Sequence, residues 1–246
     1  LGVTITTVAN IKMESGVEVT EDLEKAKTFN EFFSSVYTKE DRSNIPNIEE
    51  DANTVTIDKV EITEKDVLEL LKKLRPEKSP GPDGIHPRIL KECATELAKP
   101  LAMLFSTSMQ TGTLPLAWKE ADVVPIFKKG ARTDVNNYRP VSLTSVCCKT
   151  MEKIIRKAML KHLIENGILS QHQHGFVQGR SCTTQLLKVV DKWTEVLDSG
   201  GAVDAVYLDF AKAFDTVPHE RLLIKLASYG VRGQLLEWMR QFLTGR

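Results

Sequence analysis

The spacing of apolar residues predicts a chain of amphipathic helices with a few short strands. Apolar residues recur at intervals of three and four, the period of a helix face, in eight stretches: 20–38, 63–74, 88–98, 101–111, 146–166, 183–197, 218–229 and 234–243. Alternating or continuous β-branched and aromatic residues at 121–130, 138–145 and 205–208 predict strands. Helices and strands in this arrangement indicate an α+β fold.

Local signals predict where several of these elements begin and end. Residues 63–66 read Thr-Glu-Lys-Asp, which resembles a capping box at a helix start. Gly167 predicts the end of the long helix that precedes it. Pro100 predicts a break between the third and fourth helical stretches, and Pro125 restricts the first strand to the edge of a sheet or to a bulge.

The first helical stretch lies in an acidic N-terminal segment. Residues 1–66 contain 7 Lys and Arg against 15 Asp and Glu, a net charge of −8, and the remaining residues carry +8. The helix is predicted to be capped by Thr20 and to dock on the main body. Its apolar face is formed by Leu23, Ala26, Phe29, Phe33 and either Val36 or Tyr37. Residues 39–53 read as a linker. The basic remainder suits a body that binds polyanions, although this charge is also ordinary for a protein surface.

The cysteines and the hydropathy exclude several classes of protein. Cys93, Cys147, Cys148 and Cys182 contain no CxxC pair and no His at zinc spacing, which disfavours a zinc site. The adjacent Cys147 and Cys148 are expected to be small core residues, in a protein of the reducing nucleus and cytoplasm. No apolar stretch approaches the ~20 residues that cross a bilayer, and the first residues lack the basic start and apolar core of a secretion signal, so a membrane partner is not expected. Because it begins with Leu1, the chain is expected to be a piece of a longer protein.

The stretch VYLDFAKAFDTVPH, residues 206–219, carries the strongest indication of chemistry. Residues 205–208 are predicted to form a buried strand that ends at Asp209. A carboxylate at the end of a strand can supply a hard oxygen ligand to Mg²⁺. Taken alone, an Asp at such a position is also a common turn or capping residue.

Five motifs in a fixed order resemble the reverse transcriptases of non-LTR retrotransposons, especially the jockey-type elements of animals. The motifs are KSPGPDGI from Lys78, PIFKKG from Pro125, YRPVSL from Tyr138, HGFVQGRS from His174 and LDFAKAFDTVPH from Leu208. The resemblance implies a right-hand polymerase fold. It also implies template-directed addition of deoxynucleotides to a primer 3′-hydroxyl, with two Mg²⁺ ions in the complete enzyme.

The resemblance assigns roles to residues of the nucleotide site. Asp209 and the backbone of Phe210 would hold metal. Lys128 and Arg139, from two neighbouring strands, would bind the triphosphate by charge and forked hydrogen bonds. Ala211 would also contact the nucleotide, and Phe214 would exclude a 2′-hydroxyl from the sugar because its ring leaves that group no room. Asp215 is read as a local cap before Pro218.

Three further residues are expected to contact nucleic acid. Lys129 stands where the family often has Pro, so either Lys128 or Lys129 could make the triphosphate contact. Lys78 lies in a rigid Pro-Gly loop that follows the template in the family, with a plain structural turn as the alternative. Arg180 is a candidate for a phosphate contact or for a structural contact between fingers and palm.

The chain departs from the family in one large respect. The motif that supplies two further carboxylates is absent, and the sequence contains no Asp-Asp pair. We therefore expect an acidic leader at 1–60, fingers at 61–200 and a partial palm at 201–246, with the thumb and the rest of the palm missing. The partners would be an RNA template, a DNA primer and a dNTP.

The missing carboxylates predict that these residues alone lack polymerase activity. Two alternatives stay open, a non-catalytic RNA-binding remnant or co-opted domain, and an incomplete version of an active enzyme. The strand before Asp209 would lack its partners, which predicts aggregation or partial disorder after about Gly200.

Overall fold

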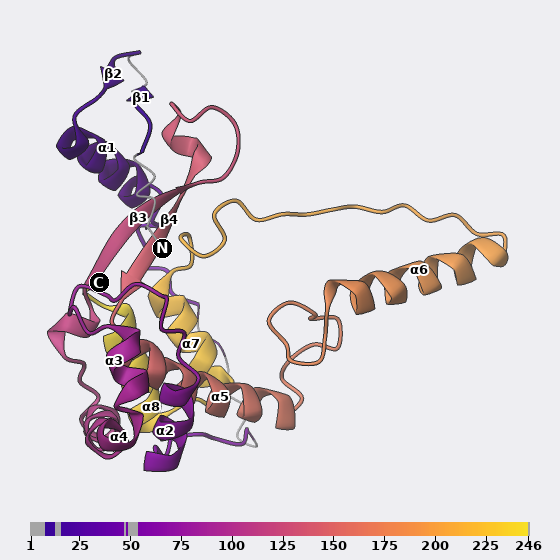
Figure 1. Ribbon diagram of the computed structural model, residues 1–246. Coiled ribbons are helices and arrows are strands. Elements are labelled where there is room, and N and C mark those ends of the chain that lie inside the picture. The colour runs from indigo at the N-terminus through magenta and orange to yellow at the C-terminus, as the bar shows by residue number, and fades with distance from the viewer. Residues whose placement is uncertain (1–7, 13–15, 47, 49–53, 246) are drawn as a thin grey trace.

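The computed structural model describes residues 8–12, 16–46, 48 and 54–245, and its helices form a body from which a hairpin and one long helix project (Figure 1). The strands are β1 (Ile11–Lys12), β2 (Glu18–Val19), β3 (Ala121–Phe127) and β4 (Tyr138–Thr144). The helices are α1 (Asp22–Ser35), α2 (Glu64–Lys72), α3 (Pro87–Glu92), α4 (Ala94–Thr111), α5 (Val146–Glu165), α6 (Cys182–Asp198), α7 (His219–Ser228) and α8 (Gly233–Leu243). Short 3₁₀ turns lie at Leu116–Trp118 and Val135–Asn137. The predicted mixture of helices and small sheets is confirmed. None of the helices in the described ranges has the length and hydropathy of a membrane span.

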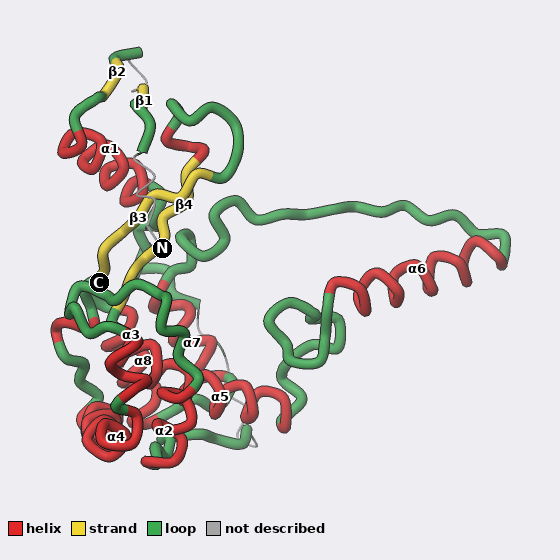
Figure 2. The backbone as a smooth tube through the Cα atoms, in the orientation of Figure 1, coloured by secondary structure: helices red, strands yellow, loops and turns green. Residues whose placement is uncertain are grey.

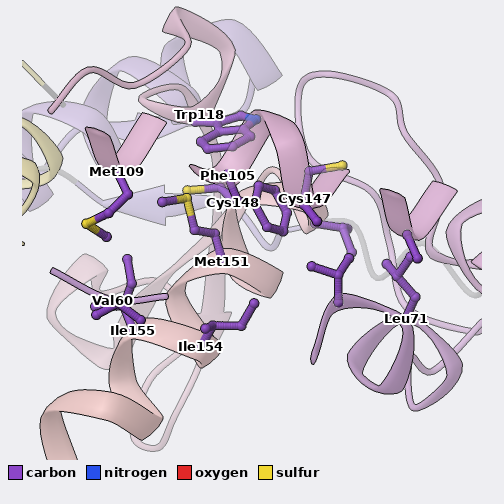
Figure 3. Close-up of a cluster of buried hydrophobic side chains, with 14 of the residues drawn as sticks. Val60, Leu71, Phe105, Met109, Trp118, Cys147, Cys148, Met151, Ile154 and Ile155 are labelled. Atoms are coloured by element: carbon purple, nitrogen blue, oxygen red, sulfur yellow. The ribbon is translucent and has the colours of Figure 1, made fainter. Parts of the chain in front are cut away.

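The helical body is held together by one large core between α2, α4, α5 and α8. Phe105 and Trp118 meet edge to face, with ring centroids 5.7 Å apart. Figure 3 shows this pair beside Cys148 and Met151 of α5. The prediction that the adjacent cysteines are core residues is confirmed, since Cys147 and Cys148 are both buried. Burial of this apolar stripe from each helix is the main source of stability for the fold.

The predicted helix break at Pro100 is wrong. The break lies at Cys93, between α3 and α4, and Pro100 lies inside α4. The apolar stripe of α4 continues on both sides of the proline, with Ala98, Ala102 and Phe105 buried against the core. Packing of this face outweighs the local preference against an internal proline. Gly112, at φ 65°, ends the helix.

Several other boundaries are confirmed because they depend on local chemistry. The Thr63 side chain accepts a hydrogen bond from the Asp66 N–H at 3.1 Å and so caps α2. Helix α5 ends at Glu165, and Gly167 follows it with φ 65°. Strands β3 and β4 pair with each other in a two-stranded sheet, with Pro125 opposite Pro140, as the edge position of Pro125 predicts.

Helix α1 docks as predicted, but on the β3–β4 hairpin and with a different cap. Phe29 and Phe33 are buried, and the Phe29 ring lies 4.9 Å from the ring of Tyr138. The predicted Thr20 cap is wrong, because the N-cap residue is Glu21 and it makes no side-chain capping bond. Leu23 is exposed, and the stem of Lys25 is buried in place of Ala26. The docked face is therefore narrower than the pattern indicates.

Helices α7 and α8 belong to the same helical body. Val231, Leu235 and Trp238 belong to the same core as α2, α4 and α5. The backbone of Ile57 bonds to Gly230 and Arg232 and forms a parallel bridge with Val231. Gly230 has φ 85°, and a Cβ at this position would overlap the carbonyl oxygen of Val55. A glycine is therefore required where the two segments meet.

The arm, which we define as residues 182–217, contrasts with the body. Figure 2 shows α6 projecting away from the other helices and a long loop returning from it. None of the side chains of α6, all of which the structure describes, is buried. The predicted strand at 205–208 is wrong, because these residues form no strand and Leu208 is 91% exposed. A strand needs a hydrogen-bonding neighbour, and the described residues supply none beside this segment.

Candidate functional site

The tip of the β3–β4 hairpin presents two basic side chains on one face. Ile126 pairs with Arg139, and the Lys128 N–H bonds to the Asn137 carbonyl at 2.8 Å. Because side chains alternate along a strand and paired residues share a face, Lys128 and Arg139 project from the same face. Both are exposed. The opposite face, with Phe127 and Tyr138, packs on α1.

The residues from Asp209 to Thr216 form a compact turn at the end of the arm. The N–H groups of Asp215 and Thr216 bond to the Lys212 carbonyl at 2.9 and 3.1 Å. Phe214 is largely exposed, but its ring meets the ring of Phe176 edge to face at 6.2 Å. We call residues 209–216 the Asp209 loop.

A cavity of about 800 Å³ lies between the hairpin tip, the Asp209 loop and α1. It is lined by Lys128 and Arg139 from the hairpin and by Asp209, Phe210, Ala211 and Phe214 from the loop. The structure thus places all six residues that were predicted to bind metal or nucleotide around one space, although Lys128 and Asp209 are 81 positions apart in the chain. Phe32 and Phe33 of α1 and Val36, which follows the helix, form the apolar part of the wall.

The charges around this cavity are divided between its walls. Lys128 and Arg139 line the hairpin side, whereas Asp209 and Asp215 line the loop side together with Lys212. Basic side chains on one wall can bind phosphate oxygens by charge-assisted hydrogen bonds. Carboxylates on the other wall can bind a divalent cation that the phosphates also contact. The arrangement suits a polyphosphate that arrives with a metal ion.

Comparison with known proteins identifies the family. The family model described as "Reverse transcriptase (RNA-dependent DNA polymerase)" matches residues 126–246, which include the hairpin from Ile126 onward and the Asp209 loop. This chain belongs to the reverse transcriptase family. It is 31% identical over 180 residues to the "Probable RNA-directed DNA polymerase from transposon BS" of Drosophila melanogaster, covering 70% of this chain and 20% of that protein.

Proteins named for the jockey element are among the relatives. The "RNA-directed DNA polymerase from mobile element jockey" of Drosophila funebris is 31% identical over 186 residues, covering 75% of this reverse transcriptase chain and 20% of that protein. The protein of the same name from Drosophila melanogaster is 32% identical over 165 residues, which cover 67% of this chain and 18% of that protein. The resemblance to jockey-type reverse transcriptases is confirmed. The chain spans about a fifth of the length of these curated relatives.

Two predicted nucleic-acid contacts of this reverse transcriptase chain lie outside the cavity wall. Lys129 is exposed beside Lys128, but only Lys128 lines the cavity. The Arg180 guanidinium donates through Nη1 to the carbonyls of Ser170, Gln171 and Gln173 at 3.0, 3.1 and 2.5 Å. Arg180 therefore holds its own loop together, whereas its predicted contact with phosphate or between fingers and palm stays a prediction.

Lys78 lies in a basic groove of about 710 Å³ on the helical body. The groove is lined by six basic residues, Lys73, Arg75, Lys78, Lys149, Lys153 and Arg156, and one acidic residue, Glu152. Part of its wall is the predicted Pro-Gly loop, which is fixed by close packing. A Cβ on Gly81 would lie 2.5 Å from the backbone of Thr144, and the Asp83 carboxylate accepts the Ile85 N–H at 3.1 Å. The loop is thus a rigid turn that also carries Lys78 into a positively charged groove.

The acidic groups of the cavity fit a metal ion only in part. Among the described residues no group of three or more His, Cys, Asp or Glu side chains is arranged to hold a metal ion. Asp209 and Asp215 supply carboxylates from a single loop. Mg²⁺ is commonly bound through one or two carboxylates together with substrate phosphates. This donor set fits a Mg²⁺ that a nucleotide shares, rather than a separate two-metal site.

The sequence did not reveal several residues that build the site. Asp215 was read only as a local cap of the turn before Pro218, but it also lines the cavity, and the cap of α7 comes from the carboxylate of Glu40. Phe33 was predicted only to lie on the docking face of the first helix, and its neighbour Phe32 was given no role. Their adjacency signals a docking face, but no local pattern indicates that the face borders the Asp209 loop.

Proposed function

We propose that this chain forms the fingers and the first part of the palm of an RNA-directed DNA polymerase and holds the incoming deoxynucleotide in the cavity of about 800 Å³. The observation that carries this proposal is the convergence of Lys128, Arg139, Asp209 and Phe214 on that one space. In this proposal residues 61–200 correspond to the fingers, residues 201–246 correspond to a partial palm, and no thumb is included.

Each side chain has a role that follows from its chemistry. Lys128 supplies a point charge to the triphosphate, and Arg139 supplies a planar fork that can bind two phosphate oxygens. Asp209 and the backbone of Phe210 would hold Mg²⁺, which neutralises phosphate charge and activates the attacking hydroxyl when bound. Phe214 would fill the space that a 2′-hydroxyl needs, and so favour deoxyribose.

We propose that these 246 residues bind a deoxynucleotide with Mg²⁺ but do not extend a primer. The carboxylates of the described site come from the Asp209 loop alone, and two-metal transfer needs ligands around both ions. Primer extension on an RNA template with the purified chain tests this. Templated, Mg²⁺-dependent product that disappears in Asp209→Ala would overturn it, and an Asp209→Asn variant controls for loss of the local fold.

A second proposed function is RNA binding, and the basic groove supports it. Six positive charges in one groove can neutralise phosphates along a single strand, and the released counterions make such binding strongly dependent on salt. If all six contact phosphates, log Kobs should fall against log salt concentration with a slope of about −4.

The test measures binding of single-stranded RNA between about 50 and 200 mM salt, conditions in which phosphate-driven affinity changes steeply. Replacing Lys149, Lys153 and Arg156 by Ala should reduce the slope by about 2 units. Replacing Lys188 and Lys192 of α6, which lie outside the groove, should leave it nearly unchanged. No RNA binding in the wild-type chain at low salt would contradict this proposal.

A further inference from the structure

The end of α1 and the segment after it cross from the hairpin to the Asp209 loop. We call residues 32–44 the strap. At its start, Phe32 and Phe33 line the cavity, and the Lys212 ammonium of the Asp209 loop lies 4.7 Å from the centre of the Phe32 ring. Further on, the Thr38 hydroxyl donates to the Thr216 carbonyl at 2.9 Å. The sequence predicts a linker from residue 39, and residues 39–46 do form irregular backbone, while 47 and 49–53 lie outside the described residues.

Glu40 of the strap caps α7, the helix that follows the Asp209 loop. Its two carboxylate oxygens accept the N–H groups of Glu220 at 3.0 Å and Arg221 at 3.1 Å. The N-cap residue itself is Pro218, whose side chain has no acceptor, so the cap comes from a residue 180 positions away. The Arg221 guanidinium also donates to the Asn44 carbonyl at 2.8 Å. A carboxylate at this end of a helix is favoured both by hydrogen bonding and by the helix dipole.

These contacts hold the C-terminal end of the Asp209 loop, whereas the preceding part of the arm does not hold its N-terminal end. Residues 201–208, directly before Asp209, form no helix or strand, so no backbone ladder fixes the loop from that side. On the other side, the bonds from Thr38 and Glu40 fix Thr216 and the start of α7. Because α1 also packs on Tyr138 of the hairpin, the strap connects the two walls of the cavity.

We propose that Glu40 and Thr38 are positioning residues that hold the Asp209 loop against the hairpin, so that nucleotide affinity depends on them although neither lines the cavity. The inference rests on the proposed nucleotide site. It gives the acidic leader a part in that site, whereas the sequence indicates only a linker at this point.

The sign of the effect separates positioning from simple electrostatics. Glu40→Ala removes a negative charge from the region of a triphosphate, and by charge alone this change should strengthen binding. If Glu40 positions the loop, the same change should weaken binding of dATP with Mg²⁺ by about fivefold, the scale of a lost helix cap. Glu40→Gln keeps one acceptor oxygen and should give an intermediate value.

The experiment measures equilibrium binding of dATP with Mg²⁺ to the full chain and adds two double-mutant cycles. Exposed Glu31→Ala, in α1 directly before the strap, is the matched control and should not weaken binding. Glu40→Ala should be non-additive with Phe214→Ala, which lies on the loop that Glu40 positions. It should be additive with Lys128→Ala on the hairpin. A general loss of folding would affect the two cycles alike, whereas a positioning role predicts coupling of Glu40 with Phe214 and not with Lys128.

The outcomes distinguish this inference from the proposed function. If Lys128→Ala weakens dATP binding but Glu40→Ala does not, the strap inference is overturned and the nucleotide site stands. If the wild-type chain binds no dATP, the proposed function fails, and hydrogen exchange at the Glu220 and Arg221 amides then decides. If these amides are protected in the wild type and in Glu31→Ala but not in Glu40→Ala, the strap inference is supported. If they are unprotected in the wild type, the inference is overturned.

Discussion

In the helical body Leu71 and Trp238 are 0% and 1% exposed, whereas in the arm Leu208 and Phe210 are 91% and 86% exposed. The body owes its shape to burial between helices. The arm contains Asp209 and Phe214, the residues proposed to act on the nucleotide, but it is held by a few contacts with Phe176 and the strap. The residues that stabilise this fold and the residues proposed for its chemistry thus occupy regions with very different packing.

The largest expected effect is on the free energy of unfolding, and it compares the same Leu→Ala substitution in the body and in the arm. Leu71→Ala should lower the free energy of unfolding by about 2–5 kcal/mol, because it leaves a cavity in the core. Leu208→Ala in the arm should change it by less than about 0.5 kcal/mol. Urea unfolding followed by circular dichroism measures both. A cost of several kcal/mol at Leu208 would mean that the arm packs on the body in solution.

The second effect concerns binding without a change in stability. Lys128→Ala and Arg139→Ala should each weaken binding of dATP with Mg²⁺ by roughly tenfold to a hundredfold, since each removes a charge-assisted contact. Both side chains are exposed, so the unfolding free energy should stay within about 0.5 kcal/mol of wild type. Lys129→Ala is the control and should change affinity by about twofold or less. Equal losses at Lys128 and Lys129 would contradict the assignment of Lys128.

A third, smaller effect is expected at the Asp209 loop. Phe214→Ala should reduce the preference for dATP over ATP by roughly tenfold, because the space beside the sugar opens. Competition binding of the two nucleotides measures the ratio. Phe210→Leu, which changes an exposed side chain while keeping the backbone proposed to bind metal, should leave the ratio unchanged. An unaltered preference in Phe214→Ala would show that the ring does not contact the sugar.

The smallest effect is a pH-dependent change in the free energy of unfolding, and it arises from Cys147 in the body. Burial, and then the nearby Asp83 carboxylate, raises the pKa of the Cys147 thiol from 9.0 to about 11. The unfolded chain therefore loses this proton first, and the stability contribution, complete below pH 9, is lost as pH rises towards 11. At pH 10 the loss should be about 1 kcal/mol. Urea titrations at pH 8 and pH 10 test it, and Cys147→Ala should remove this part of the pH dependence.

The sequence predicts those parts of the fold that neighbouring residues determine. The Thr63 cap, the Gly167 helix end and the edge strand with Pro125 all follow from local chemistry, and all are found. Pro100 shows the limit of that reasoning, because a buried face on both sides of it keeps α4 continuous. The strand at 205–208 fails for the opposite reason, since β-propensity without a partner strand does not form a sheet.

The candidate site likewise has one part that local motifs predict and one part that they do not. The motifs around Lys128, Arg139 and Asp209 predict which residues share a site, and the structure brings these residues to one cavity. No local pattern predicts that Glu40 caps α7 or that Phe32 lines the cavity, because these contacts join residues about 180 positions apart. Such contacts depend on how separate elements pack, which a single sequence does not reveal.

The backbone pairing of Ile57 with Val231 joins positions that are 174 residues apart, and it bears on the order in which the chain can fold during synthesis. Helices α2, α4 and α5 emerge from the ribosome before α8, which supplies Leu235 and Trp238 to their shared core. Until α8 follows, the apolar faces of the earlier helices stay open to solvent, and contacts of such high contact order form late. We therefore expect nascent chains that stop after residue 200 to need chaperone protection.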